Sequence, residues 1–303
     1  MKKVLVIAGP TAVGKSDFAV QLALKYGLSI ISGDSIQVYR GLDIGSGKIT
    51  PAEMKGVKHY LIDILSPKES YSVSDFQWMA RKIIDESEKP VIICGGTGLY
   101  LKACLYDYTF DPDEEKLPSA DPQLEKLDDD TLYAMLKESD PLQAQKIHPH
   151  NRRRVLRSLT IQKRTGKTQS AIEKEQSHQM IYDTLIAGCT MDRTKLYERI
   201  NARVDQMFEN GLEKEVKGLL DAGVTFEDTC MEGIGYREWK GYYNGTMDLK
   251  EVKTQIQTHS RQFAKRQYTW LNHQMPVHWF DITDPKDTDR ILKEIDVWIR
   301  GGA

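Results

Sequence analysis

Short apolar runs alternate with longer amphipathic stretches through the first hundred residues of the chain. The runs that predict buried strands are residues 4–8, 29–32, 60–64 and 91–94. Residues 15–26 and 74–88 carry apolar side chains at helical spacing, and Ser74 with Gln77 suits a capping box at the start of the second helix. This alternation of strand and helix predicts a mainly parallel sheet with helices on both faces.

The alternation stops near Tyr108. Residues 111–180 contain no convincing strand and are helical and charged in character, whereas residues 185–189 and 277–280 again have the pattern of strands. We therefore predict an α/β core formed by residues 1–110 and 184–303. A helical insertion domain, residues 111–183, interrupts this core.

The composition limits the class of protein. The chain has 303 residues, of which 40% are hydrophobic and 28% charged, as in soluble globular proteins. Its apolar runs are far shorter than the roughly 20 residues of a membrane-spanning helix. We therefore expect a cytoplasmic protein without a membrane partner. The four cysteines have no CxxC spacing, which argues against a zinc site or a disulfide framework. No obligate protein partner is evident, and we expect a monomer.

The net charge of −2 hides an uneven distribution of charge. Residues 111–140 contain eleven acidic residues and three lysines, whereas residues 141–172 contain eight Lys or Arg and no acid. In the basic segment Arg153 and Arg157 are four residues apart, so they share a helical face, with Arg154 beside them. Such a run can be a solvated charged face. It also suits the phosphate backbone of a nucleic acid.

A complete phosphate-binding motif, GxxxxGK[ST], follows the first predicted strand and opens the first predicted helix. Its residues are Gly9, Pro10, Thr11, Ala12, Val13, Gly14, Lys15 and Ser16. The glycines let backbone N–H groups surround a phosphate, Lys15 supplies a cation, and the Ser16 hydroxyl can bind Mg²⁺. The motif predicts a P-loop NTPase-like core that binds a polyphosphate with Mg²⁺, but it does not say which polyphosphate.

Two further residues follow predicted strands. Asp34 comes after residues 29–32, and Thr97 comes after residues 91–94 in a Gly-Gly-Thr-Gly turn. The carboxyl ends of parallel strands face the ligand crevice, so we expect Asp34 near the phosphates as a Mg²⁺ partner or a base. In isolation Asp34 would suit a turn or a helix N-cap equally well. The turn lacks the acid that usually ends a Walker-B strand, which argues against NTP hydrolysis.

Six motifs occur in order along the chain. They are GPTAVGKS (9–16), SGDSIQVYRGLDIGSGK (32–48), GGTGLYLKA (95–103), HPHNRRRVLRSL (148–159), GIGYRE (233–238) and RQFAKRQYTW (261–270). Together they resemble the tRNA dimethylallyltransferase (isopentenyltransferase) family along nearly the whole chain. Many kinases share the P-loop, whereas the DSxQxY, GGTxLY and KRQxTW set is highly specific. The resemblance implies transfer of a dimethylallyl group from dimethylallyl diphosphate to N6 of adenosine 37 in the tRNA anticodon loop.

The resemblance also implies roles for individual residues. The P-loop would hold the diphosphate of the donor, and Asp34 would serve as general base for the adenine amine. Thr97 would lie near the departing oxygen, and Arg203 would clamp the diphosphate. The residues that we expect to contact tRNA are Asp34, Ser35, Ile36, Gln37, Arg153, Arg154, Arg157, Gly235, Tyr236, Arg237, Lys265 and Arg266.

The residues alone leave two other functions open. A small-molecule or nucleoside kinase would use the same P-loop, with Asp34 activating a substrate hydroxyl. A non-catalytic RNA-binding protein would leave the P-loop and Asp34 unexplained. Salt-sensitive tRNA binding without ATP turnover would separate a transferase from a kinase.

Overall fold

The computed structural model describes residues 1–108, 121–175 and 179–301. The chain divides into two compact units, one formed by Met1–Tyr106 with Met180–Ala303 and the other by Asp107–Gln179. The expected boundary at residues 110 and 111 lies outside the described residues. The chain returns to the first unit at Met180, before the expected residue 184, because Met180 bridges to Tyr106 and the Ile181 N–H donates to the Leu105 carbonyl at 2.9 Å.

The first unit is built on a six-stranded parallel sheet with the order β3-β2-β4-β1-β5-β6. The strands are β1 Lys3–Ala8, β2 Ser29–Ser32, β3 His59–Tyr60, β4 Val91–Gly95, β5 Asp183–Thr190 and β6 His278–Asp281. This sheet confirms the predicted α/β class. The central strand β1 leads directly into the P-loop, so the phosphate-binding motif starts at the middle of the sheet.

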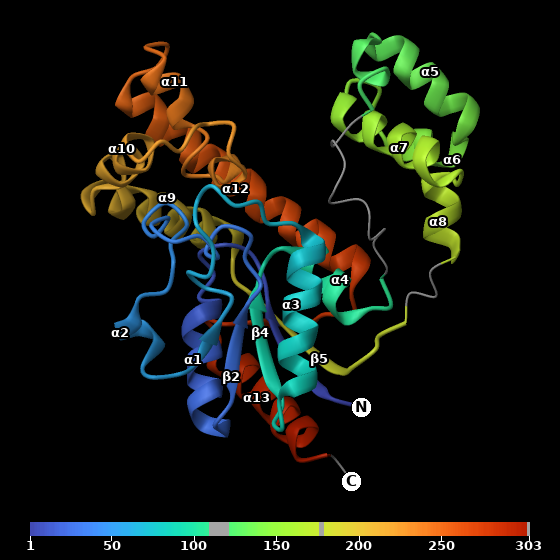
Figure 1. Cartoon of the computed structure of the whole chain (residues 1–303). Helices are drawn as coiled ribbons and strands as arrows, with labels where there is room; N and C mark the ends of the chain where they lie inside the picture. The colour runs from blue at the N-terminus through green and yellow to red at the C-terminus, as the bar shows by residue number, and fades with distance from the viewer. Residues whose placement is uncertain (109–120, 176–178, 302–303) are drawn as a thin grey trace. The chain divides into compact units, whose positions relative to one another are not determined.

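Helices cover both faces of the sheet (Figure 1). The helices of this unit are α1 Lys15–Tyr26, α2 Pro51–Met54, α3 Val73–Glu86, α4 Gly98–Leu105, α9 Arg193–Glu209, α10 Leu212–Asp221, α11 Trp239–Tyr243, α12 Leu249–Gln274 and α13 Pro285–Arg300. Successive β1 side chains point to opposite faces. Val4 and Val6 share a core cluster with α3 and α4, whereas Leu5 and Ile7 share another with α1 and α13. Burial on both faces explains why β1 is apolar from Val4 to Ala8.

Two local predictions were wrong. The strand expected at residues 60–64 is only the pair His59–Tyr60, because Leu61 and Asp63 adopt left-handed backbone angles (φ 61° and 54°) that turn the chain out of the sheet. The capping box of α3 is formed by Ser72 and Asp75 rather than by Ser74 and Gln77. Its hydroxyl and carboxylate bind each other's backbone N–H, as the motif requires.

The second unit is helical and has a small core of its own. Its helices are α5 Asp129–Ser139, α6 Pro141–Lys146, α7 Arg152–Thr165 and α8 Gln169–Glu175. Leu132, Leu136 and Val155 have no exposed surface and belong to the cluster that joins α5 to α7. Across both units, the described helices include none that is long and apolar enough to cross a bilayer.

Candidate active site

Three loops meet where β1, β2 and β4 end, and two glycines allow their close approach. A side chain on Gly95 would come within 2.5 Å of the Gly33 carbonyl oxygen, and one on Gly96 would come within 2.7 Å of the Gly9 carbonyl oxygen. Contacts this short exclude any residue with a Cβ atom unless the backbone moves. The GGTG turn after β4 is therefore held between the P-loop and the loop that carries Asp34.

The P-loop has the backbone shape that its sequence predicts. Gly9 and Gly14 have positive φ angles of 140° and 107°, and Gly14 is the N-cap of α1. The loop is also tied to α12, because the Thr11 N–H donates to Gln267 Oε1 at 2.9 Å. The N–H groups at the start of α1 and the helix dipole favour an anion here.

Lys15 is held inside its own loop. Its Nζ atom donates to the Pro10 carbonyl at 2.6 Å. Burial lowers the pKa of Lys15, the nearby thiols of Cys94 and Cys189 oppose this shift, and Arg203 and Asp34 add smaller effects of opposite sign. Lys15 is thus close enough to Arg203 and Asp34 for the three charges to influence one another, and an anionic ligand would relieve its desolvation.

Asp34 combines a structural role with an available oxygen atom. Its Oδ1 atom accepts hydrogen bonds from the backbone N–H groups of Ile36 (2.8 Å) and Gln37 (3.2 Å), which is the turn geometry considered from the sequence. Among the described residues, no hydrogen bond reaches Oδ2. Asp34 is only partly buried. One carboxylate oxygen therefore fixes the loop while the other can accept a proton.

Arg203 is directed by the backbone of a neighbouring loop. Its Nη2 atom donates to the Gly47 carbonyl at 2.8 Å, and a side chain on Gly47 would lie 1.7 Å from Nη2. Burial lowers the pKa of Arg203, and the carboxylates of Asp34 and Glu53 oppose that shift. Arginine stays protonated in proteins, so the structure holds a desolvated cation opposite Asp34.

Thr97 begins α4 as its N-cap residue but does not use its side chain for capping. Its carbonyl accepts the N–H groups of Tyr100 (2.9 Å) and Leu101 (3.2 Å). No hydrogen bond involving the hydroxyl occurs within the described part of the chain. The hydroxyl of Thr97 is therefore available to a ligand beside the GGTG turn.

Oxygen atoms suited to Mg²⁺ lie next to the P-loop. The Ser16 side chain is exposed at the start of α1, and Asp34 offers Oδ2. No group of three or more His, Cys, Asp or Glu side chains suited to a metal occurs in residues 1–108, 121–175 and 179–301. Mg²⁺ commonly binds one or two protein groups together with substrate phosphates and water. These residues fit a Mg²⁺ ion that arrives with a diphosphate.

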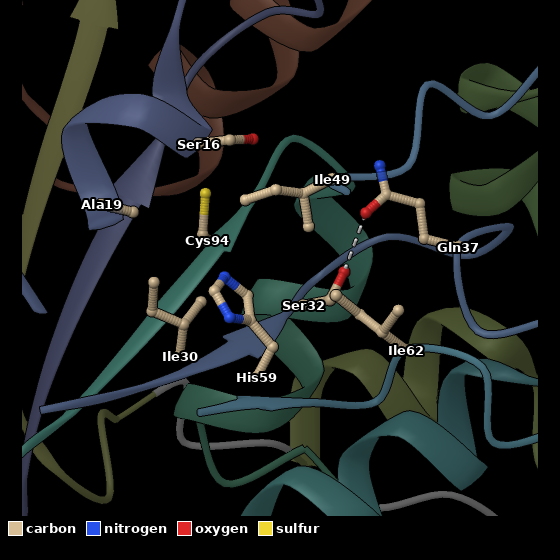
Figure 2. Close-up of a pocket in the computed structure, with 9 residues that line it drawn as sticks. All are labelled: Ser16, Ala19, Ile30, Ser32, Gln37, Ile49, His59, Ile62 and Cys94. Carbon is tan, nitrogen blue, oxygen red and sulfur yellow. Dashed lines mark hydrogen bonds between the residues drawn. The ribbon is translucent and has the colours of Figure 1, made fainter. Parts of the chain in front are cut away.

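A small cavity of about 20 Å³ lies beside Ser16 (Figure 2). It is lined by Ser16, Ala19, Ile30, Ser32, Gln37, Ile49, His59, Ile62 and Cys94. Burial lowers the pKa of His59, which favours the neutral ring, and the hydrogen bond between its Nδ1 atom and the Val57 carbonyl at 2.9 Å opposes this shift. Burial also raises the pKa of Cys94 to about 11. The lining is uncharged, and much of it is aliphatic.

Two residues near the P-loop were missed from the sequence. Gln267 is 7% exposed and lies on the buried stripe of α12 with Ala264 and Leu271. A polar residue at an apolar helical position was the available signal. Arg199 stands one turn before Arg203 on α9, and its Nη2 atom would be 3.8 Å from a side chain on Gly14. The i, i+4 spacing was the signal for this second arginine.

The residues expected to contact tRNA have unequal exposure. Those with exposed side chains are Arg153, Arg154, Arg157, Arg237, Lys265 and Arg266, and those that are partly buried are Ser35, Ile36 and Gln37. Gly235 and Tyr236 are buried. Tyr236 has no exposed surface and its hydroxyl donates to Glu215 at 2.7 Å, which argues against a direct contact with tRNA.

Comparisons with known proteins agree with this geometry. The family model described as IPP transferase matches residues 37–274. The tRNA dimethylallyltransferase of Anoxybacillus flavithermus is 47% identical over 99% of this chain and 97% of its own length. The chain belongs to the IPP transferase family. A second relative of the same name, from Bacillus subtilis, is 45% identical over 98% of this chain and 96% of its own length.

A solved structure of a family member extends the likeness beyond bacteria. It is described as a eukaryotic dimethylallyltransferase acting on tRNA, and it superposes with a TM-score of 0.86 at 30% identity. The match covers 100% of this chain and 81% of the eukaryotic chain. This IPP transferase family member therefore has the fold of a prenyltransferase that acts on tRNA, with the P-loop, Asp34 and Arg203 gathered at one end of its sheet.

Proposed function

We propose that this protein transfers a dimethylallyl group from dimethylallyl diphosphate to N6 of adenosine 37 in tRNA, releasing diphosphate. One observation carries the proposal: Lys15, Asp34 and Arg203 lie within electrostatic reach of one another where the P-loop begins α1. Two cations suit a diphosphate, and the carboxylate suits an amine that loses a proton. The names of the curated relatives support the same reaction.

The cations account for departure of the diphosphate. As the C1–O bond of the donor breaks, negative charge develops on the leaving oxygen and positive charge on the allylic carbon. The P-loop N–H groups, Lys15 and Arg203 stabilise the leaving group, and they do so strongly because Lys15 and Arg203 are desolvated. Mg²⁺, held by the Ser16 hydroxyl, would neutralise further charge on the diphosphate when bound.

Asp34 accounts for removal of the proton from the adenine amine. The exocyclic amine of adenine attacks C1, the N6–C1 bond forms, and the amine must lose one proton. The Asp34 carboxylate accepts that proton through Oδ2, because Oδ1 already holds the turn at Ile36 and Gln37. Adenine must leave its stack in the anticodon loop to reach Asp34, as is usual for enzymes that modify bases.

The uncharged cavity suits the hydrocarbon end of the donor. Its aliphatic side chains include Ile30, Ile49 and Ile62, and Ser16 also borders it (Figure 2). A short branched chain packed against these side chains would remove apolar surface from water, at about 25 cal/mol per Å² buried. A dimethylallyl group attached to a diphosphate in the P-loop therefore finds an apolar surface within reach.

Exposed basic side chains suit the tRNA. In the second unit, Arg153, Arg154 and Arg157 lie on the outside of α7, which belongs to an acid-free stretch of sequence. In the first unit, Lys265 and Arg266 are exposed on α12. Exposed cations on helices bind a phosphate backbone with little desolvation cost. We assign the helical insertion, 111–183 in our sequence prediction, to tRNA binding.

One assay tests the reaction and its kinase alternative together. The protein is incubated with Mg²⁺, labelled dimethylallyl diphosphate and unmodified tRNA, and the labelled nucleotide is identified by nuclease digestion. We expect label on N6 of the adenosine next to the anticodon, with one diphosphate released for each label. A parallel reaction with ATP and nucleosides should give no phosphoryl transfer. Phosphorylated nucleoside without labelled tRNA would refute the proposal in favour of a kinase.

A further inference from the structure

A single carboxylate organises the loop of residues 43–47, here called the Gly47 loop. Glu215, on α10, accepts hydrogen bonds from the backbone N–H groups of Asp43 (3.0 Å) and Ile44 (2.7 Å) through Oε2. It accepts a third from the Gly45 N–H (3.0 Å) through Oε1. Three consecutive donors on one ionised acceptor form a strong, charge-assisted set of hydrogen bonds.

Tyr236 completes the support of this loop. Its hydroxyl donates to Glu215 Oε1 at 2.7 Å and accepts the Ser46 N–H at 3.1 Å. The ring lies against Gly45, where a side chain would come within 2.6 Å of it. Burial and the nearby Glu215 carboxylate raise the pKa of Tyr236 well above its usual value, so the hydroxyl keeps its proton and remains a donor.

The opposite side of the Gly47 loop faces the active site. The Gly47 carbonyl accepts from Arg203 Nη2 at 2.8 Å and from Gln37 Nε2 at 3.4 Å. The Gln37 amide also lies 3.5 Å from the Ser46 carbonyl. The N–H groups of residues 43–46 therefore point to Glu215 and Tyr236, while two of the loop carbonyls point to residues beside Asp34. A shift of the loop would move Arg203 directly.

We infer that Glu215 is a positioning residue for prenyl transfer, acting through the Gly47 loop on Arg203. The inference rests on the proposed function, because Arg203 is assigned there to the leaving diphosphate. Glutamine cannot replace Glu215: its amide offers one acceptor oxygen, and its NH₂ group would face backbone N–H donors. A loop held by a weaker acceptor leaves Arg203 less well aimed at the developing charge.

The chain offers a matched control on the same helix. Glu213, two residues before Glu215 on α10, accepts the Tyr242 hydroxyl at 3.0 Å, and no described hydrogen bond links either residue to the Gly47 loop. The variants Glu213→Gln and Tyr242→Phe thus repeat the chemical change of Glu215→Gln and Tyr236→Phe away from the site. Each pair is compared in single-turnover transfer at saturating concentrations of both substrates.

We expect Glu215→Gln to lower the single-turnover rate by about 10²-fold, the loss typical of a misplaced catalytic group. Its tRNA Kd should stay within about twofold of the wild type, and Glu213→Gln should keep the wild-type rate. Tyr236→Phe, which keeps the packing and removes one hydroxyl, should show a smaller rate loss than Glu215→Gln and a larger one than Tyr242→Phe. If Glu215→Gln does not fold, the comparison of Tyr236→Phe with Tyr242→Phe tests the inference by itself.

A double-mutant comparison separates positioning from general loosening of the fold. If Glu215 acts through Arg203, then Arg203→Gln with Glu215→Gln should be about as slow as Arg203→Gln alone. The inference would be overturned if the rate losses of the two single variants multiply in the double variant. It would also be overturned if Glu215→Gln and Tyr236→Phe lose no more rate than their controls Glu213→Gln and Tyr242→Phe. Absence of transfer by the wild-type protein would instead refute the proposed function, so the two failures are distinguishable.

Discussion

The two units of the molecule hold their cations in opposite ways. In the first unit, burial lowers the pKa of both Lys15 and Arg203, and each donates to a backbone carbonyl, of Pro10 and Gly47 respectively. In the second unit, Arg154 is exposed on α7. Desolvated, aimed cations stabilise charge that develops during a reaction, whereas solvated ones provide mainly long-range attraction to a polyanion.

This contrast predicts that the buried cations control the chemical step and that the exposed cations control tRNA binding. Changes in the buried cations should alter the chemical step and leave tRNA binding nearly intact. Changes on α7 should alter the affinity for tRNA and its dependence on salt, and should leave the rate at saturation nearly intact.

The largest effect should come from Lys15→Ala. Removing a catalytic cation from a phosphate site typically costs roughly 10³–10⁵-fold in rate, and we expect a loss of this order in single-turnover transfer. Lys25→Ala, at the far end of α1, removes an ion pair with Asp296 and a contact with the Tyr26 ring, both away from the P-loop, and serves as the control. The tRNA Kd of both variants, measured by filter binding, should equal that of the wild type. A large loss of tRNA affinity in folded Lys15→Ala would contradict this division of roles.

A core substitution in the second unit should destabilise that unit without destabilising the first. Leu136 has no exposed surface, so Leu136→Ala should lower the free energy of unfolding of this unit by about 2–5 kcal/mol. Leu142, in the same unit, is 62% exposed, and Leu142→Ala should change stability by less than about 0.5 kcal/mol. Calorimetry should show an earlier transition for Leu136→Ala alone, with weaker tRNA binding and unchanged binding of dimethylallyl diphosphate. Weaker binding of dimethylallyl diphosphate by Leu136→Ala would show that the second unit also affects the diphosphate site.

The smallest effect concerns salt. In Arg154→Ala and Arg157→Ala, the slope of log affinity against log salt should become shallower by about 0.7–0.9 for each phosphate that the variant no longer neutralises. Lys163, also on α7, is held by Asp121 at 2.7 Å, so Lys163→Ala should leave the slope nearly unchanged. Titrations of tRNA at several salt concentrations provide the measurement. Wild-type slopes in both arginine variants would mean that α7 presents only a solvated charged face.

The sequence predicted those parts of the site whose signal is local. The P-loop could be placed because its glycines and Lys15 adjoin a strand and a helix in one continuous segment. Asp34 could be placed because it follows a strand of a parallel sheet. Gln267 and Glu215 could not, because each acts on a loop more than a hundred residues away in the chain. Their function depends on how α12 and α10 pack, which local pattern does not encode.

The mispredicted strand and the unexpected burial of Tyr236 have the same physical origin. Residues 60–64 have the composition of a strand, but the left-handed backbone at Leu61 and Asp63 is a tertiary requirement. Tyr236 stands in a motif shared with tRNA-modifying enzymes, and its burial beneath the Gly47 loop could not be read from the motif. Its place in GIGYRE marked it as important without indicating whether it faces a ligand or supports a loop.

Asp34 is assigned to the chemical step, and α7 is assigned to the docking of tRNA. The most direct test measures two quantities, the single-turnover rate at saturating substrates and the tRNA Kd, for Asp34→Asn and Arg154→Ala together. Asp34→Asn keeps an oxygen for the turn at Ile36 but cannot take the proton, so its rate should fall by roughly 10²–10⁴-fold with little change in Kd. Arg154→Ala should raise Kd and keep the rate. A wild-type rate in Asp34→Asn would remove Asp34 from the mechanism and leave it as a turn residue.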